Sequence, residues 1–523
     1  MDFSAFIPVR GKPLSKQQRF SFCLLSAFAW GLAAHGIALV TKFTFQDELA
    51  YLFSVGSTVA SGRWFLGCLG AFVRLLFGSP NFSLPLLSGF WILFLSGLAG
   101  FQITELLNLQ RKGTLFLFCG LMVTFPVTAS LFLYGFTAPY YLVGLCLTIA
   151  GASVLCRKRG VVPFLAGVLL VILGTAVYQS YISVFLCLLL LNFMQEVRQT
   201  QKWRFSLLLR EVLWYCGACI VMISGYLLSV RISTALCGQA LVNYKGLSTM
   251  GSVSINELLK RAKLAVYLFL FPKRSNSEAY LFPYRLINCY YLCLAGLAVL
   301  GAADVIRYFR KSTLKGISLL LAFGCFPLAV NFIFVMCDPS EVYTLMQTAG
   351  IMPFLLLLHL ADNCPPYVHK GFSLRKLVVA LLAIFCVFSL RIDNAAYEKA
   401  ELAQSRIQQY FTVLVAQIRG TPGYTADTPV AYIADTSAFG DSTFHQIEGF
   451  AELSIAPLRF DTTPFCIGNT WERFLDLRCG FAPPVADASQ FSDLPQVRAM
   501  PCYPDYGSIQ MIDGTLVVKL TEP

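Results

Sequence analysis

Residues 20–40 read FSFCLLSAFAWGLAAHGIALV, a run of twenty-one residues without Asp, Glu, Lys or Arg. About 20 apolar residues in a helix span the hydrocarbon core of a bilayer. Four basic residues (Arg10, Lys12, Lys16 and Arg19) precede the run, and no convincing small-residue cleavage site follows it. We therefore expect a first membrane anchor here and not a removable signal peptide.

The composition extends this expectation to most of the chain. Of its 523 residues, 57% are hydrophobic and only 13% are charged, whereas soluble domains carry about 25% charged residues. A soluble fold of this length could not bury so much apolar surface. We expect an all-α polytopic membrane protein with about eleven transmembrane helices, the shorter of which need tilt or local thinning of the bilayer. The expected spans are residues 20–40, 84–104, 114–133, 139–156, 161–178, 180–195, 206–230, 286–306, 316–336, 344–361 and 376–390.

The placement of basic residues predicts the orientation. They gather at the N-terminus and in every second connection, whereas the short connections 134–138 and 337–343 contain no Lys or Arg. Cytoplasmic loops of membrane proteins carry such an excess of Lys and Arg. We therefore expect a cytoplasmic N-terminus, and we attribute the net charge of +12 to topology and not to nucleic-acid binding.

The last part of the chain differs in character. Residues 391–523 contain nine Lys or Arg against sixteen Asp or Glu, which favours the outer side of the membrane. Apolar positions at helical spacing predict a helix over Asn394–Arg419, and Pro429–Ala434 and Leu516–Leu520 are typical of short strands. We expect two domains: a transmembrane domain at residues 1–390 and a small α+β extracytoplasmic domain at residues 391–523.

The cysteines and histidines predict no cofactor and no metal site. Fifteen of the 18 cysteines lie in or beside apolar runs, where cysteine usually acts as a small buried hydrophobe. Cys466, Cys479 and Cys502 lie in the acidic tail, where one disulfide is compatible with an oxidising compartment. The sequence does not decide which two of these cysteines would pair. The four histidines are scattered and no CxxC pair occurs, so we expect no metal.

Polar residues at the expected outer boundary are the candidates for chemistry, because such groups are costly near a bilayer. Asp47 and Glu48 follow the first span, and Arg63-Trp64 come about fifteen residues later. A carboxylate in apolar surroundings suits a general base, and a guanidinium suits phosphate. The alternative is that both carboxylates are solvated or capping residues and that Arg63 extends to the lipid headgroups.

Three further features are expected on the same side. Tyr178-Gln179 interrupt an apolar run, either at the mouth of a cavity or as an interfacial aromatic belt. Residues 254–272 resemble a basic amphipathic helix that lies among headgroups or covers a lipid-phosphate substrate. The remaining candidates are either binding groups or surface and capping residues, and they are Lys273, Arg274, Arg285, Asp338 and Glu341.

The order of several short motifs resembles that of the serotype-converting glucosyltransferases of the GtrII type, which belong to the GT-C superfamily. The motifs run along nearly the whole chain and are individually unspecific. They are His35-Gly36, Gln46-Asp47-Glu48-Leu49, Gly62-Arg63-Trp64-Phe65, Val177-Tyr178-Gln179-Ser180-Tyr181, Asn331, Tyr343-Thr344-Leu345-Met346, Met500-Pro-Cys-Tyr-Pro and Val517-Val-Lys519-Leu.

This resemblance implies a multi-pass enzyme of the bacterial plasma membrane. The implied donor is a polyprenyl-phosphate-linked sugar, the implied acceptor is an extracytoplasmic glycan, and the implied base is an acidic residue in the first outer loop. Asp47 aligns better with the family's aspartate than Glu48 does. Two other classes stay open at this point: a polysaccharide polymerase or ligase, and a lipid-linked sugar flippase or transporter. The sequence names neither the sugar nor the acceptor.

Overall fold

The chain forms two compact units in a computed structural model that describes residues 14–44, 46–56, 58–242, 254–272, 280–363, 368–369, 372–434, 447–450, 452–453 and 470–522. Met1–Thr41 and Phe53–Asn394 form the first, which we call the helical unit. Lys42–Leu52 and Ala395–Pro523 form the second, which we call the C-terminal unit. The segment around Asp47 and Glu48 therefore belongs to the C-terminal unit, although it follows the first span in sequence.

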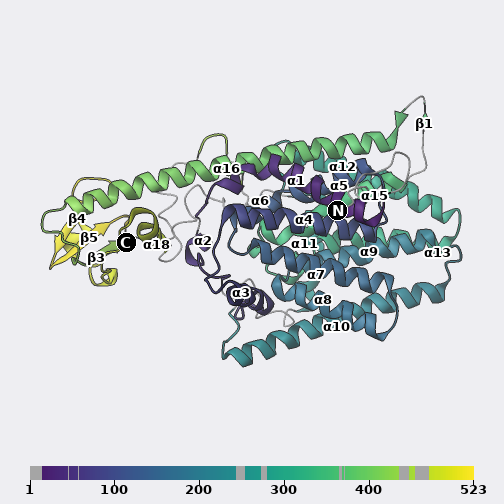
Figure 1. Ribbon diagram of the computed structural model, residues 1–523, viewed down its shortest axis with the longest axis horizontal. Helices are drawn as coiled ribbons and strands as arrows, with labels where there is room; N and C mark the ends of the chain where they lie inside the picture. Colours follow the sequence, from purple (N-terminus) through teal and green to yellow (C-terminus); the bar gives the residue numbers. More distant parts are fainter. Residues whose placement is uncertain are drawn as a thin grey trace, which may run out of the picture. The chain divides into compact units, whose positions relative to one another are not determined.

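Long apolar helices build the helical unit (Figure 1). Within the described residues, nine have the length and hydropathy of a membrane span. A tenth is the pair α5 (Lys112–Thr124) and α6 (Pro126–Leu133), which is bent by 48° where Pro126 begins the second helix. The nine are α1 (Lys16–Val40), α4 (Pro85–Leu106), α7 (Ala138–Arg157), α9 (Tyr181–Gln199), α10 (Phe205–Cys237), α12 (Leu286–Phe309), α13 (Thr313–Val330), the joined η5 (Thr344–Ile351) and α15 (Met352–Asn363), and α16 (Leu374–Gly420).

These helices confirm the expectation of an all-α polytopic membrane protein. Each expected span coincides with one helix or helix pair, and the span expected at 161–178 corresponds to α8 (Val161–Val177). With its 17 residues, α8 is apolar but shorter than the nine helices named above. The short α14 (Ile333–Met336) continues α13 after a break at Asn331. Residues 368–369 and 372–373 form a two-stranded antiparallel ribbon, β1 and β2, before α16.

Glycines bring α7 and α8 into close contact. A Cβ on Gly151 would lie 2.6 Å from the carbonyl oxygen of Gly167, and a Cβ on Gly174 would lie 2.6 Å from that of Gly144. Small residues at helix interfaces let membrane helices pack backbone to backbone. The pairing of Gly144 with Gly174 and of Gly151 with Gly167 also shows that the two helices are antiparallel.

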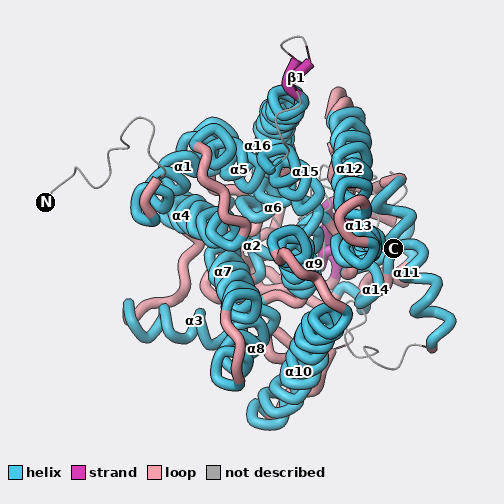
Figure 2. The backbone as a smooth tube through the Cα atoms, turned by 90° about the vertical axis from the view of Figure 1, so that its right-hand side faces the viewer, coloured by secondary structure: helices cyan, strands magenta, loops and turns pink. Residues whose placement is uncertain are grey.

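One helix of the helical unit was not expected from the sequence. Trp64–Phe77 forms α3, which has 14 residues. In Figures 1 and 2 it lies crosswise to α7 and α8 of the same unit. Its outward residues Leu75 and Phe77 are apolar and exposed, which is typical of a helix that lies in the membrane interface.

A second difference concerns α16. The sequence predicted a span that ends at residue 390 and a separate helix from Asn394, but the structure has one continuous helix of 47 residues. No Gly or Pro occurs between Leu374 and Arg419, so nothing in this stretch breaks the helix. At 1.5 Å per residue α16 is roughly 70 Å long.

The C-terminal unit contains a three-stranded sheet in the order β3-β5-β4. The expected strands are confirmed as β3 (Val430–Ile433) and β5 (Thr515–Lys519), which pair in parallel. The unexpected β4 (Ile509–Ile512) pairs with β5 through a hairpin at Asp513-Gly514, where both residues have positive φ, as a two-residue turn requires. The remaining elements of this unit are α2 (Gln46–Ala50), α18 (Thr470–Cys479), η7 (Ala488–Gln490) and α19 (Pro495–Arg498).

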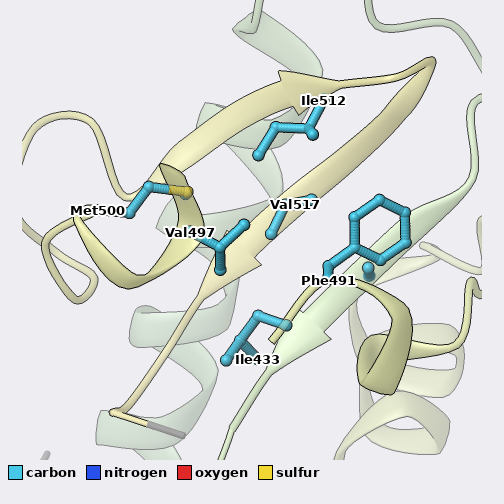
Figure 3. Close-up of a cluster of buried hydrophobic side chains, with 7 residues drawn as sticks. Ile433, Phe491, Val497, Met500, Ile512 and Val517 are labelled. Atoms are coloured by element: carbon cyan, nitrogen blue, oxygen red, sulfur yellow. The ribbon is translucent and has the colours of Figure 1, made fainter. Parts of the chain in front are cut away.

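Apolar side chains from each strand form the core of this small domain. Ile433, Ile512 and Val517 project from the three strands toward Val497 and Phe491 (Figure 3). Cys479 and Cys502 are free thiols, so no disulfide joins them, and Cys466 lies outside the described residues.

Candidate functional site

The candidate residues fall into two groups, one in each unit. The first group is the acidic segment of the C-terminal unit. Asp47 and Glu48 lie in α2, where the N–H of Tyr51 donates to the carbonyl of Asp47 over 2.9 Å. Glu48 is 2% exposed and forms an ion pair with Lys42, whereas Asp47 is only half-buried. The adjacent carboxylates, equivalent in the sequence, therefore have different environments.

The pKa of the Lys42 ammonium group is lower than usual, mainly because the side chain is largely surrounded by protein. Burial lowers the pKa of its ammonium group, the Glu48 carboxylate raises it, and the Arg478 guanidinium lowers it again. The Lys42–Glu48 pair directs Glu48 toward the interior of the unit. Asp47 is therefore the carboxylate that is more accessible to a substrate.

The second group is centred on Arg63 in the helical unit. Gly62, with φ of +73°, turns the chain immediately before α3 and places Arg63 at the N-cap of that helix. Its Nη1 donates to the hydroxyl of Tyr141 over 3.0 Å, and its Nε donates to Oε1 of Gln179 over 3.4 Å. The guanidinium carbon also lies 5.1 Å from the ring centre of Tyr178, within the range of a cation–π interaction.

Aromatic rings and backbone contacts support this arginine. Tyr178 stacks on Tyr141 with ring centres 4.6 Å apart. The Tyr178 and Tyr343 hydroxyls lie 3.5 Å apart. The side chain of Gln179 donates to the carbonyl of Ser61 over 2.8 Å. The structure therefore brings together Arg63, Tyr178 and Gln179, three of the residues predicted from the sequence.

Trp64, the neighbour of Arg63, packs inside the helical unit. Its indole Nε1 donates to the hydroxyl of Ser229 in α10 over 3.0 Å. Its ring lies against a buried cluster formed by Ala176, Tyr226 and Val230. These contacts attach α3 to α8 and α10.

The outer loop predicted to be a basic helix is confirmed as the helix α11 (Ile255–Leu270), which Ser254 caps. Arg261 makes an ion pair with Glu257 and donates to the carbonyl of Cys337 over 3.1 Å. Asn331 donates to the carbonyl of Ala265 over 3.0 Å. Lys273 and Arg274 lie outside the described residues, and Arg285 is exposed at the N-cap of α12.

A cavity of about 280 Å³ lies between α11, α13 and η5. Aromatic and aliphatic side chains form most of its wall, and Gln347 and Asn331 are among its few polar residues. Gln347 lies within η5, and Tyr343 of the Arg63 cluster is the N-cap of the same element. A long apolar chain fits such a wall better than a sugar does.

The acidic residues of the short connection before η5 have separate roles. Asp338 caps the 3₁₀ helix η4 (Pro339–Glu341), because its Oδ1 accepts from the N–H and the hydroxyl of Ser340. These donors lower the pKa of the Asp338 carboxyl. Of the two alternatives for Asp338, the structure therefore supports the capping role, at the start of η4. Glu341 is exposed at the end of η4.

Two residues of the Arg63 cluster were not among the sequence candidates. Tyr141 lies near the start of α7, and Tyr343 precedes η5. An aromatic pair at the beginning of a predicted span (Tyr140-Tyr141) is the only signal for the first, and it is equally typical of an interfacial belt. Among the described residues, no group of three or more His, Cys, Asp or Glu has the arrangement of a metal site.

The profile of the family described as "Glucosyl transferase GtrII" matches residues 36–354, more than half of the chain. The chain belongs to this GtrII family. It is therefore a membrane glycosyltransferase. No curated protein and no solved structure matches it significantly.

The family match covers both groups of candidate residues but not most of the C-terminal unit. It includes both carboxylates of α2, the Arg63 cluster and the connection that contains Tyr343. The match ends within α15. It therefore includes no residue of α16 and no strand of the sheet in the C-terminal unit. The part of the C-terminal unit that packs around α2 is thus outside the family profile.

Proposed function

We propose that the protein transfers a hexosyl residue, a glucosyl residue in the first instance, from a polyprenyl-phosphate-linked donor to an extracytoplasmic glycan. Family membership supports the sugar transfer. The Arg63 cluster supports a phosphate-linked donor, because a guanidinium with five N–H donors binds phosphate through two of them at once. The apolar cavity beside η5 supports an isoprenoid tail on that donor.

The proposed reaction is a single displacement at the anomeric carbon. A hydroxyl of the acceptor glycan loses its proton to the carboxylate of Asp47 as its oxygen attacks the anomeric carbon. The bond between that carbon and the phosphate oxygen breaks, and the polyprenyl phosphate leaves with the electron pair. Attack from the face opposite the phosphate inverts the anomeric configuration.

One carboxylate suffices for this reaction. A phosphate leaving group needs stabilisation of its negative charge more than it needs a proton, and a nearby cation provides that stabilisation. Arg63 takes this role, with Lys273, Arg274 and Arg285 as further basic residues for the lipid phosphate and Glu341 as a polar contact for the sugar. Asp47 is the base because Glu48 is buried against Lys42.

Replacing the base tests this assignment. We expect Asp47→Asn to lower kcat about 10²- to 10⁴-fold, the usual contribution of a general base. The assay uses the full-length protein in membranes with a panel of polyprenyl-phosphate hexoses, and it measures free polyprenyl phosphate together with the glycosylated acceptor. Asp493→Asn is the matched control, because this carboxylate of the same unit is exposed in a surface ion pair with Arg498.

The same assay separates the alternatives. If Asp47→Asn and Glu48→Gln both retain full transfer activity, neither carboxylate is the base. A flippase would release neither product from a phosphate-linked donor, and a polymerase would require a diphosphate-linked donor. The anomeric configuration of the product, read by NMR, tests inversion.

A further inference from the structure

The acidic segment at residues 42–52 is integrated into the C-terminal unit by hydrogen bonds from residues that come more than 350 positions later in the chain. Phe43 stacks on Tyr397 of α16, with ring centres 6.0 Å apart and planes inclined by 12°. Both rings are buried. The segment is therefore part of the core of this unit and not a loop that extends from the first span.

Gln404 of α16 forms hydrogen bonds with the segment through both the oxygen and the nitrogen of its side-chain amide. Its Oε1 accepts from the N–H of Thr44 over 2.9 Å and from the Thr44 hydroxyl over 3.2 Å. Its Nε2 donates to the carbonyl of Lys42 over 3.3 Å. One side chain thus bonds two backbone groups of the segment.

Arg478 of α18 bonds the same two residues of the segment. Its Nη2 donates to the carbonyl of Lys42 over 3.3 Å and to the hydroxyl of Thr44 over 3.1 Å. The helix α18 also packs against α2. Lys42, which pairs with Glu48, therefore has its backbone carbonyl bonded by both Gln404 and Arg478.

These contacts determine where the carboxylates of α2 lie. Lys42 and Thr44 come four and two residues before α2 in the sequence, so we expect a shift of their backbone to move Asp47 and to weaken the ion pair between Lys42 and Glu48. A displacement of a reacting group by about 1 Å lowers a rate by about a hundredfold. Neither Gln404 nor Arg478 falls within the family match at residues 36–354.

We propose that Gln404 and Arg478 are positioning residues of the glycosyl transfer, through which the C-terminal unit orients the carboxylates of α2. The proposal rests on the proposed function, in which Asp47 is the base. It assigns to the later part of the C-terminal unit, Ala395–Pro523, a positioning role in catalysis, in addition to any contact that it makes with the acceptor glycan.

The test uses full-length protein in nanodiscs with a saturating acceptor and a polyprenyl-phosphate hexose as the donor. We expect Gln404→Ala and Arg478→Gln each to lower kcat at least tenfold and to leave the donor KM within about threefold, because the Arg63 cluster belongs to the other unit. Arg478→Lys should recover part of the lost kcat, since a lysine retains the charge and one donor. The thermal midpoint of each variant is measured in the same preparation.

Two matched controls separate positioning from general stability. Gln408 lies one turn further along α16 and is exposed, so Gln408→Ala should leave kcat unchanged. Arg419 of α16 donates to the carbonyl of Gly480 over 3.2 Å and lies 5.5 Å from the ring centre of Phe481. Arg419→Gln therefore removes an arginine that bonds the α18 end of the same unit, and it should also leave kcat unchanged.

The decisive measurement is a double-mutant cycle with Asp47→Asn. If Arg478 acts through Asp47, Arg478→Gln should cost little further activity once Asp47 has been replaced. Equal losses in both backgrounds would overturn the proposal, as would a wild-type kcat in Gln404→Ala and Arg478→Gln. If Asp47→Asn and Glu48→Gln themselves retain full activity, the proposed function fails first and this inference fails with it.

Discussion

Arg63 carries a charge beside the apolar helices of a membrane protein, where an ionisable group is costly and usually functional. Its guanidinium donates to Tyr141 and Gln179 and lies over Tyr178. These contacts set the plane of the guanidinium before any ligand arrives. A preorganised fork of this kind recognises a phosphate by geometry as well as by charge.

Arg63→Lys tests that geometry. A lysine retains the charge but not the planar fork, so we expect it to lose about 1.5–3 kcal/mol of interaction, or roughly 10- to 100-fold in kcat/KM for the donor. Steady-state kinetics over a range of donor concentrations measure the change. Arg231→Lys, at an exposed arginine of α10, is the control. Wild-type kcat/KM in Arg63→Lys would exclude a bidentate phosphate contact at this residue.

The sequence identified single members of this cluster but not the way they assemble. Arg63, Tyr178 and Gln179 could be selected because each is polar at the expected edge of a span. Tyr141 could not, because an interfacial tyrosine and a functional tyrosine have the same sequence pattern. Tyr343 belongs to one of the motifs of the family resemblance, but that motif assigns it no role. The difference between Asp47 and Glu48 was also invisible, because it depends on the ion pair with Lys42.

Among the elements, α7 and α8 show how glycine spacing controls packing in a bilayer. Lipid is as apolar as the side chains, so membrane helices associate mainly through close packing and hydrogen bonds. Gly151 and Gly167 place the two backbones in contact. The tyrosines that surround Arg63 come from the same end of this antiparallel pair, since Tyr141 lies near the start of α7 and Tyr178 directly follows α8.

Gly151→Leu should therefore disturb the helix pair and, through it, the Arg63 cluster. The added side chain meets the backbone of Gly167 and cannot be accommodated by a rotamer change, so we expect a loss of about 1–3 kcal/mol, as in other overpacked sites. Thermal unfolding in detergent, followed by a thiol-reactive dye or by light scattering, measures it. Gly217→Leu on α10 is the control, because a Cβ there meets nothing within 4 Å. An unchanged midpoint in Gly151→Leu would contradict the close contact.

The elements that sequence reasoning missed are those without a strong local signal. The helix α3 is too short to span a bilayer and contains Arg74, so its apolar run was not counted. The strand β4 is short and half-exposed. The continuity of α16 (Leu374–Gly420) is not evident from composition, because the composition changes near residue 391 although the helix continues. Composition marks where a helix leaves the apolar region, whereas only Gly, Pro or a cap marks where it ends.

At the scale of the whole molecule, the number of spans decides on which side the C-terminal unit lies. Nine long helices and the bent pair α5–α6 make ten within the described residues, and α8, with its 17 residues, would make eleven if it crosses the membrane. The glycine pairs extend the antiparallel register, which places Val161 of α8 opposite Arg157 of α7 and Val177 opposite Tyr141. The helix α8 thus accompanies α7 over almost its full length, and we therefore expect α8 to cross the membrane beside α7.

Eleven spans would place the two termini on opposite sides, as the basic N-terminal region and the acidic residues 391–523 also predict. We expect alkaline phosphatase, which is active only outside the cytoplasm, to be active when fused after Pro523 and inactive when fused after Lys202. The second fusion tests α8 directly, because residue 202 follows α9 and changes sides if α8 does not cross. A fusion after Arg111, which follows two spans on either count, is the inactive control. Activity after Lys202 together with inactivity after Pro523 would leave ten spans, and it would separate the C-terminal unit from any extracytoplasmic glycan.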